Sequence, residues 1–212
     1  MKEYRSVKSK SESVHEYCKS MQFKRVAFTG HRPNKLYGYN MDSREYMRLE
    51  DIIKEIIEVL IDFSGAEEFY TGGALGFDTI VEQILIDFKK DKYCSSKPIK
   101  DYMCIPFKNQ FKKWNYEQVS IWFNMLDKCH EVMTVDTIDG YKCDAVAVGE
   151  YHPLKMTYRN MYMVDNCDVL VACWDETMKG GTYDCIQYAK SKGKEIIYIN
   201  PQTLRIKGAM WR

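Results

Sequence analysis

Short apolar segments alternate along this chain with longer segments whose apolar residues recur at helical spacing. The short segments, predicted as strands, are 25–29, 68–71, 100–105, 131–135, 168–174 and 195–200. The longer ones, predicted as helices, are 42–63, 75–88, 110–128, 157–166 and 181–192, while 137–153 has no clear period and is predicted as a long loop. Strands that alternate with helices of this length form βαβ units around a parallel sheet. The pattern therefore predicts an α/β fold, a Rossmann-like, doubly wound, mainly parallel sheet with helices on both faces.

The length of 212 residues fits one large domain, which we place at residues 23–212. Residues 1–22 are polar and lack an apolar period, so they are predicted to be a flexible or helical extension that the fold does not need. No signal-peptide pattern and no apolar run of about 20 residues is present, which excludes a typical membrane span. The eight cysteines include no CxxC pair, as is usual for a reduced compartment. We therefore expect a cytoplasmic protein without a metal or a cofactor.

Three loops that contain glycine follow predicted strands. They are Thr29-Gly30-His31-Arg32, then Thr71-Gly72-Gly73 with Gly76, and finally Gly180-Gly181-Thr182. In a parallel sheet these loops all lie at the carboxyl edge, where such folds bind ligands. Glycine allows an anion to approach the backbone closely, and the first amides of a following helix attract a phosphate. Each loop alone could be only a tight turn, but the three together favour a site for a phosphate-bearing ligand.

Several side chains near this edge could act on a ligand, and each also has a purely structural interpretation. His31 could be an acid, a base or a phosphate donor, or it could only cap its loop. Asp78 could bind a ribose hydroxyl or only complement a helix dipole. Arg159 and Asn160 could contact a phosphate or a base, or Arg159 could pair with a carboxylate on a solvated face. Asp175 could be a ribose ligand, a catalytic carboxylate or a loop cap.

An aromatic residue is also a candidate at this edge. Phe107 follows Pro106 at the end of a predicted strand and is the better candidate for stacking on a base. The aromatic residues of the following segment lie at helical spacing, which places at least two of them in the core; they are Trp114, Tyr116, Trp122 and Phe123.

Four motifs give the chain a family resemblance. They are TGHRP, YTGGALGFD, IPFKNQFKKW and DVLVACWDETMKGGT. Together they resemble the SLOG superfamily, named after the SMF/DprA and LOG proteins, and within it the branch of small bacterial and prophage proteins typified by YpsA and YoqJ. The resemblance runs from about Lys24 to Pro201. It implies a Rossmann-like nucleotide-binding domain, with Gly72, Gly73 and Gly76 in one phosphate or ribose loop and Gly180, Gly181 and Thr182 in another.

The last motif departs from the LOG enzymes, which hydrolyse the N-glycosidic bond of a nucleoside monophosphate. Thr182 is kept, but Cys185 stands where those enzymes place a catalytic glutamate, and Asp184 lies one residue earlier. This departure puts LOG-type hydrolysis in doubt.

Two functions follow from these observations. The first is binding of a nucleotide or of an ADP-ribose- or NAD-derived small molecule, by a protein that senses or sequesters it. The alternative is a hydrolase or transferase that acts on the N-glycosidic or phosphoester bond of a nucleotide, with His31, Asp78 or Asp175 as acid or base. The net charge of +1 and the lack of a basic stripe disfavour nucleic acid as a partner, and the sequence leaves a homo-oligomer open.

Overall fold

A computed structural model describes residues 22–90, 98–177 and 179–208 of the chain. Within these residues the chain forms a seven-stranded sheet in the order β4-β3-β2-β1-β5-β6-β7. Six strands are parallel, namely β1 (Arg25–Gly30), β2 (Glu68–Thr71), β3 (Lys100–Ile105), β4 (Glu131–Thr134), β5 (Val169–Cys173) and β6 (Glu195–Asn200). The last strand, β7 (Arg205–Lys207), pairs antiparallel with β6. The predicted Rossmann-like α/β fold is confirmed.

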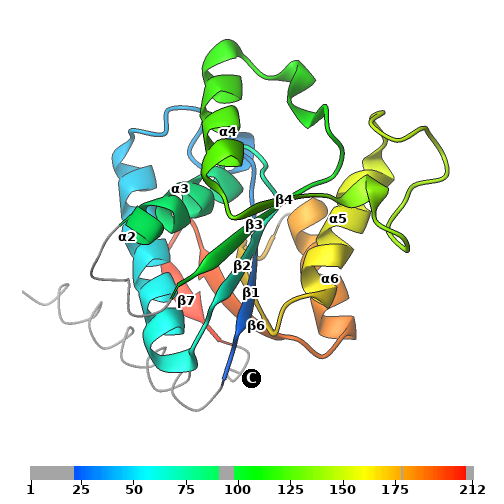
Figure 1. Ribbon diagram of the computed structural model, residues 1–212. Helices are drawn as coiled ribbons and strands as arrows, with labels where there is room; N and C mark the ends of the chain where they lie inside the picture. The colour runs from blue at the N-terminus through cyan, green and yellow to red at the C-terminus, as the bar shows by residue number, and fades with distance from the viewer. Residues whose placement is uncertain (1–21, 91–97, 178, 209–212) are drawn as a thin grey trace, which may run out of the picture.

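The helices cover the sheet on both faces (Figure 1). On one face lie α2 (Arg44–Val59), α3 (Phe77–Lys90) and α4 (Tyr116–Lys128), and on the other lie α5 (Pro153–Asp165) and α6 (Gly181–Ser191). From β1 the chain winds outward to β4, and it then crosses over to β5 on the other side of β1. The strand order therefore reverses between β1 and β5, and such a reversal opens a crevice at the carboxyl ends of the two strands.

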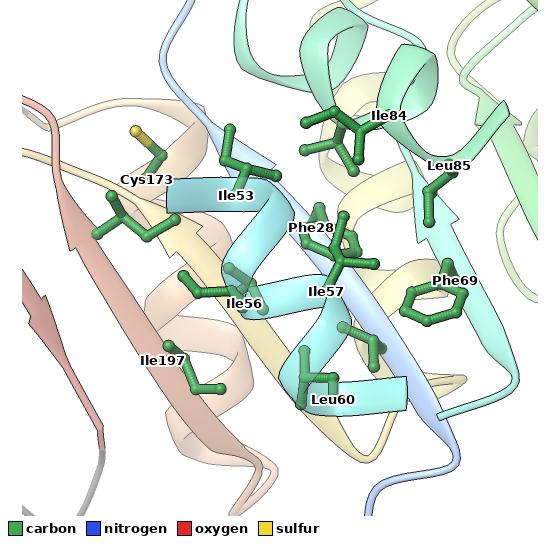
Figure 2. Close-up of a cluster of buried hydrophobic side chains, with 14 of the residues drawn as sticks. Phe28, Ile53, Ile56, Ile57, Leu60, Phe69, Ile84, Leu85, Cys173 and Ile197 are labelled. Carbon is green, nitrogen blue, oxygen red and sulfur yellow. The ribbon is translucent and has the colours of Figure 1, made fainter. Parts of the chain in front are cut away.

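The core beneath α2 shows why these residues form these elements. Ile53, Ile56 and Ile57 recur at helical spacing, and none is more than 1% exposed. They face side chains of the central strands such as Phe28 and Phe69 (Figure 2). Each isoleucine buried in this way contributes roughly 1.5–3 kcal/mol to stability.

The predicted helix 110–128 is wrong in its first part. Residues Gln110–Lys113 form a 3-10 turn, η3, and α4 begins only at Tyr116. The Asn115 side chain accepts a hydrogen bond from the Gln118 amide, and the Gln118 side chain accepts one from the Asn115 amide. This reciprocal capping box fixes the helix start.

Other boundaries differ from the sequence pattern by a few residues. Helix α5 begins at Pro153 instead of 157, because His152 caps it and proline is favoured in the first turn. After α2, the helical segment continues through a wider turn, η2 (Leu60–Ser64), to Gly65. Strand β4 runs into a 3-10 turn, η4 (Val135–Thr137), and the short strand β7 was not predicted.

Within the described residues, core packing begins just before β1. The predicted extension 1–22 lies outside the described residues except for Gln22, and Phe23 already packs in the core.

The six described cysteines are free thiols, and all except Cys129 are buried. Within the described residues, no helix combines the length and the apolar character that a membrane crossing requires.

Candidate functional site

A pocket of about 490 Å³ opens where the strand order reverses, at the carboxyl ends of β1 and β5. Its walls come from the loop after β1, the segment between β2 and the first turn of α3, the first three turns of α5, and the loop between β5 and α6. Ten residues predicted from the sequence line it: Thr29, Gly30, His31, Arg32, Asp78, Arg159, Asn160, Gly180, Gly181 and Thr182. Predicted residues of the first and third glycine loops thus meet at one site with Asp78, Arg159 and Asn160.

The other six predicted residues do not line this pocket. Thr71, Gly72, Gly73 and Gly76 lie behind it, in and just before the loop between β2 and α3. Gly76 has a φ of +93°, and a Cβ there would come within 2.8 Å of the His31 carbonyl oxygen, so only glycine fits where the two loops touch. Phe107 and Asp175, the last two, are described below.

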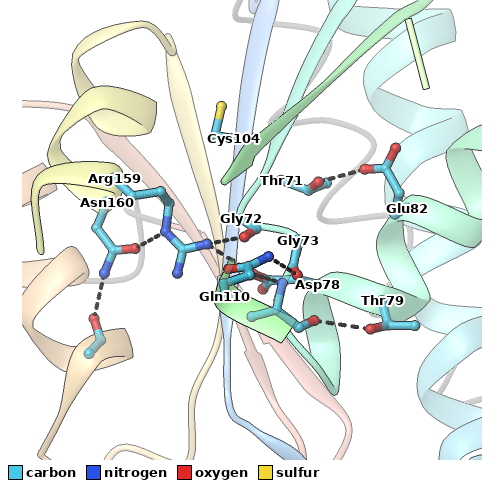
Figure 3. A network of polar contacts seen from close by, with 12 residues as sticks. Thr71, Gly72, Gly73, Asp78, Thr79, Glu82, Cys104, Gln110, Arg159 and Asn160 are labelled. Carbon is cyan, nitrogen blue, oxygen red and sulfur yellow. Dashed lines mark hydrogen bonds and ion pairs between the residues drawn. The ribbon is translucent and has the colours of Figure 1, made fainter. Parts of the chain in front are cut away.

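Arg159 and Asn160, on α5, connect the loops around the pocket (Figure 3). The Arg159 guanidinium donates Nη1–H to the Gly72 carbonyl and Nε–H to Asn160 Oδ1, the latter at 2.9 Å. Asn160 Nδ2 in turn donates to the Gly181 carbonyl at 3.2 Å. A Cβ at Gly72 would overlap Arg159 Nη1, so this glycine makes room for the guanidinium. The network fixes the two glycine loops relative to each other.

Asp78 completes this network. Its Oδ2 lies 3.7 Å from Arg159 Nη1 and accepts a hydrogen bond from the Ala74 amide at 3.3 Å. Burial raises the pKa of this carboxyl, while the nearby charges of Arg159 and Arg32 oppose the rise. Arg159 and Asp78 are thus held largely by protein groups and present only part of their surface to the pocket.

Positively charged side chains outnumber carboxylates in the lining of the pocket. Among the described residues, the cationic side chains that line the pocket are Arg32, Lys35, Arg159 and Lys179, against two carboxylates, Asp78 and Asp184. Lys35 Nζ donates to the Lys179 carbonyl at 3.2 Å and lies 3.4 Å from the position of a Cβ on Gly180. Since the first amides of α6 also face this region, the arrangement attracts an anion.

Arg32 has the side chain most available to a ligand. It is exposed, and among the described residues its guanidinium has no hydrogen-bonding partner. The walls of the pocket still remove part of its hydration, and this desolvation, together with the charge of Arg159, lowers its pKa. An arginine remains charged even so, and its fork of donors suits a phosphate.

His31 and Asp175 form a buried pair beneath the pocket. His31 Nε2 lies 3.3 Å from Asp175 Oδ1, and the histidine is only 4% exposed. Burial lowers the pKa of His31, although the Asp175 carboxylate acts in the opposite direction. Asp175 also accepts hydrogen bonds from the amide and the hydroxyl of Thr177. It therefore contacts His31 and its own loop rather than the pocket.

Two comparisons connect this chain to known proteins. The family model of the YspA SLOG family matches residues 26–204. The chain belongs to the YspA SLOG family. It is also 35% identical over 150 residues to the uncharacterized SPbeta prophage-derived protein YoqJ of Bacillus subtilis (strain 168), which covers 71% of this chain and 85% of that protein. The resemblance predicted from the sequence is confirmed, and SLOG membership suggests a nucleotide-related function.

The position at which this SLOG chain departs from the LOG enzymes lies in the first turns of α6. The Cys185 thiol is 1% exposed, and burial raises its pKa to about 12, although a hydrogen bond with Thr29 opposes the rise. A neutral buried thiol does not serve as a carboxylate. Asp184, in contrast, is exposed and lines the pocket, so the acidic group at this end of the site comes from the neighbouring position.

Several lining residues were missed by the sequence analysis. Lys179 directly precedes the Gly180-Gly181 pair, which was the only signal for it, and nothing in the pattern around Lys35 distinguishes it from an ordinary surface lysine. Tyr151 belongs to the segment without a clear apolar period. Met156 belongs to the first turn of α5, which begins before the predicted helix start.

Glu82 lies behind the site and is fully buried. It accepts a hydrogen bond from the Thr71 hydroxyl at 2.5 Å. Burial, and next the charge of Asp101, raise the pKa of Glu82 from 4.5 to about 8, against the effects of Thr71 and Lys89. The carboxyl is therefore largely protonated in the folded protein at neutral pH.

This pKa predicts a pH dependence of stability. Well below pH 4.5 the Glu82 carboxyl is protonated in both the folded and the unfolded state. Between pH 4.5 and about 8 this carboxyl ionises in the unfolded state only. The free energy of unfolding therefore falls as the pH rises through this range. Relative to Glu82→Gln, the wild type should lose about 2 kcal/mol of unfolding free energy between pH 6 and 7.5, since one proton contributes about 1.4 kcal/mol per pH unit. Urea unfolding of both proteins at the two pH values measures this, with the exposed Glu45→Gln as control. An equal difference at both pH values would contradict the raised pKa.

Proposed function

We propose that the pocket at the reversal of strand order binds a nucleotide-type small molecule, with its phosphates at the first turn of α6. The observation that carries the proposal is the meeting of the Gly180–Thr182 segment with Lys35 and Arg32 from the loop after β1. Helix amides, lysine and arginine are the groups that proteins use to bind phosphate. The pocket volume of about 490 Å³ is in the range of small-molecule sites.

The site supports a ligand of the ADP-ribose or NAD-derived class as well as a simple nucleotide. Besides its cationic groups, the pocket is lined by Pro153 and Met156 from the first turns of α5. This less polar part of the lining suits the base and the ribose of such a ligand.

Binding without turnover is our first choice of role, so that the protein would sense or sequester its ligand. Cys185 replaces the glutamate of the LOG enzymes and is buried. Asp78 is held by Arg159 and the Ala74 amide, and Asp175 is held by Thr177 and lies against His31. The carboxylates of Asp78 and Asp175 are therefore both engaged by protein groups, and neither is placed to act on a bound ligand as a general base.

One observation favours the second candidate, hydrolysis or transfer at an N-glycosidic or phosphoester bond. Asp184 is exposed, lines the pocket and lies in the first turn of α6, where the proposed phosphate binds. Incubation with nucleoside monophosphates, NAD and ADP-ribose, followed by chromatography, separates the two roles. Recovery of unchanged ligand supports binding, whereas release of base or phosphate that Asp184→Asn abolishes supports the enzyme.

The variant Arg32→Ala should keep the fold and weaken ligand binding by about ten- to a hundredfold. The side chain is exposed and makes no hydrogen bond within the described residues, so its removal leaves no buried group unpaired. Loss of a charge-assisted hydrogen bond to a phosphate costs about 1.5–3 kcal/mol. Calorimetric titration of both proteins with the same nucleotide measures the change, and Arg44→Ala, an exposed arginine that does not line the pocket, is the matched control. Equal affinities would remove Arg32 from the site.

A further inference from the structure

A second pocket, of about 610 Å³, lies beside the one described above. The two pockets have three lining residues in common, Arg32, Tyr151 and Met156. The two pockets therefore adjoin at these three residues. We call the second pocket the η3 subsite, because the turn η3 and the residues around it form one wall.

The η3 subsite combines cations with aromatic rings. Lys112 and Lys113 are exposed on η3, and Trp114 follows them. On the opposite wall Tyr151 is 60% exposed, and Lys113 Nζ lies 5.7 Å from the centre of its ring. Only one carboxylate among the described residues, that of Glu150, lines this subsite. Positive charge beside an exposed aromatic ring is what binds a base next to a phosphate.

The subsite is held in place by contacts to the loop after β2. Gln110 Nε2 donates to the Gly73 carbonyl at 2.8 Å, and Trp122 Nε1 donates to the same oxygen at 3.1 Å. These bonds connect η3 and α4 to the loop after β2. In the same loop, the Gly72 carbonyl accepts a hydrogen bond from Arg159. The walls of both pockets are thus fixed by one network before any ligand binds.

Phe107, predicted from the sequence to stack on a base, belongs to the floor of this subsite. It is only 3% exposed, and its ring lies between Lys155 Nζ, 5.8 Å from the ring centre, and the ring of Tyr151, 6.1 Å away. Phe107 therefore supports Tyr151 from below, and Tyr151 offers the accessible stacking surface.

We infer that the ligand carries two nucleoside units joined through phosphates, the second of which occupies the η3 subsite. This inference rests on the proposed function and narrows its ligand class. Arg32 lies at the junction of the two pockets and binds the phosphate bridge. Lys112 and Lys113 bind charge on the second unit, and its base stacks on Tyr151.

The test compares AMP and GMP with diadenosine and diguanosine di-, tri- and tetraphosphates by calorimetric titration of the full chain. Stacking of a second base adds about tenfold or more in affinity. At least one dinucleoside polyphosphate should therefore bind about tenfold or more tightly than its mononucleotide. Three linker lengths are included because the bridge must span from one pocket to the other.

Variants of the lysines on η3 then test whether the η3 subsite provides the gain in affinity. Lys113→Gln should reduce the affinity for the preferred dinucleoside polyphosphate by about threefold or more and leave that for the mononucleotide unchanged. Lys112→Gln is a second variant with the same expectation. Lys108→Gln, an exposed lysine of the same segment that lines neither pocket, is the matched control and should change neither affinity.

The outcomes separate the two proposals. If the mononucleotide binds and no dinucleoside polyphosphate binds more tightly, the η3 subsite is refuted and the proposed function stands. A gain in affinity that Lys112→Gln and Lys113→Gln leave intact also refutes the subsite. If neither class of ligand binds, and NAD and ADP-ribose do not bind either, the proposed function itself fails.

Discussion

Lys155→Met should lower the free energy of unfolding by about 3–5 kcal/mol, the usual cost of removing one partner of a buried ion pair. Lys155 Nζ donates to Asp136 Oδ2 at 2.9 Å, and both side chains are 1% exposed. The Gly149 amide is the other donor to that oxygen, at 2.8 Å, while Asp136 Oδ1 has no hydrogen-bond partner among the described residues. Without Lys155 the carboxylate keeps its burial and loses its counter-charge. Urea unfolding at neutral pH measures the loss.

A double variant distinguishes the loss of charge balance from the loss of the other hydrogen bond of Lys155, to the Ala147 carbonyl. Asp136→Asn/Lys155→Met removes both charges, keeps a similar side-chain volume and should recover a large part of the stability lost in the single variant. If the double variant is as unstable as Lys155→Met, the loss of the Lys155 hydrogen bond to the Ala147 carbonyl would explain the cost instead.

This ion pair also affects the site, because it anchors the segment between η4 and α5. The partners lie at either end of that segment, and Lys155 and Asp136 bind Ala147 and Gly149 within it. Tyr151, which lines both pockets, follows two residues later. Lys155→Met protein should therefore lose affinity for ligands that stack on Tyr151 even at temperatures where it remains folded.

Local sequence patterns were sufficient to predict the parallel strands and the edge of the sheet at which the candidate pocket lies. A strand such as β5 is buried at every position and reads as an uninterrupted apolar run. The edge of the sheet follows from the order of elements, so the loops at Gly30 and Gly181 could be placed together without coordinates. The predicted fold is confirmed by the strand order, and the predicted family is confirmed by the family-model match over residues 26–204.

Contacts between segments far apart in the chain could not be predicted in this way. Arg159 and Gly72 are 87 residues apart, and no local pattern shows that the glycine makes room for the guanidinium. Similarly, His31 and Asp175 are 144 residues apart, so their pairing depends on the register of β1 against β5. The long segment before α5 is ordered by a buried ion pair instead of an apolar period, which is why the sequence suggested only a loop.

Gly30→Ala should lower the free energy of unfolding by about 3 kcal/mol, at the upper end of the usual cost of overpacking. An added Cβ would overlap the Cβ, Cγ and Cδ1 atoms of Phe77, whose ring is fully buried and packs against Phe28. Because Phe77 is the first residue of α3, relief of the overlap requires a shift of the helix start that carries Asp78. The expected fall in melting temperature is about 6–12 °C for a chain of this size.

Gly181→Ala is the matched control, because it adds the same methyl group at the same edge of the sheet. No atom lies within 4 Å of its Cβ position, and neither glycine has a positive φ. This variant should melt within about 2 °C of the wild type, since surface substitutions usually change stability by less than about 0.5 kcal/mol. It should nevertheless weaken nucleotide binding, because the methyl group points into the space where the proposed phosphate meets α6. Gly30→Ala protein as stable as the wild type would show that Phe77 and α3 yield easily, and that the loop after β1 has room the structure does not indicate.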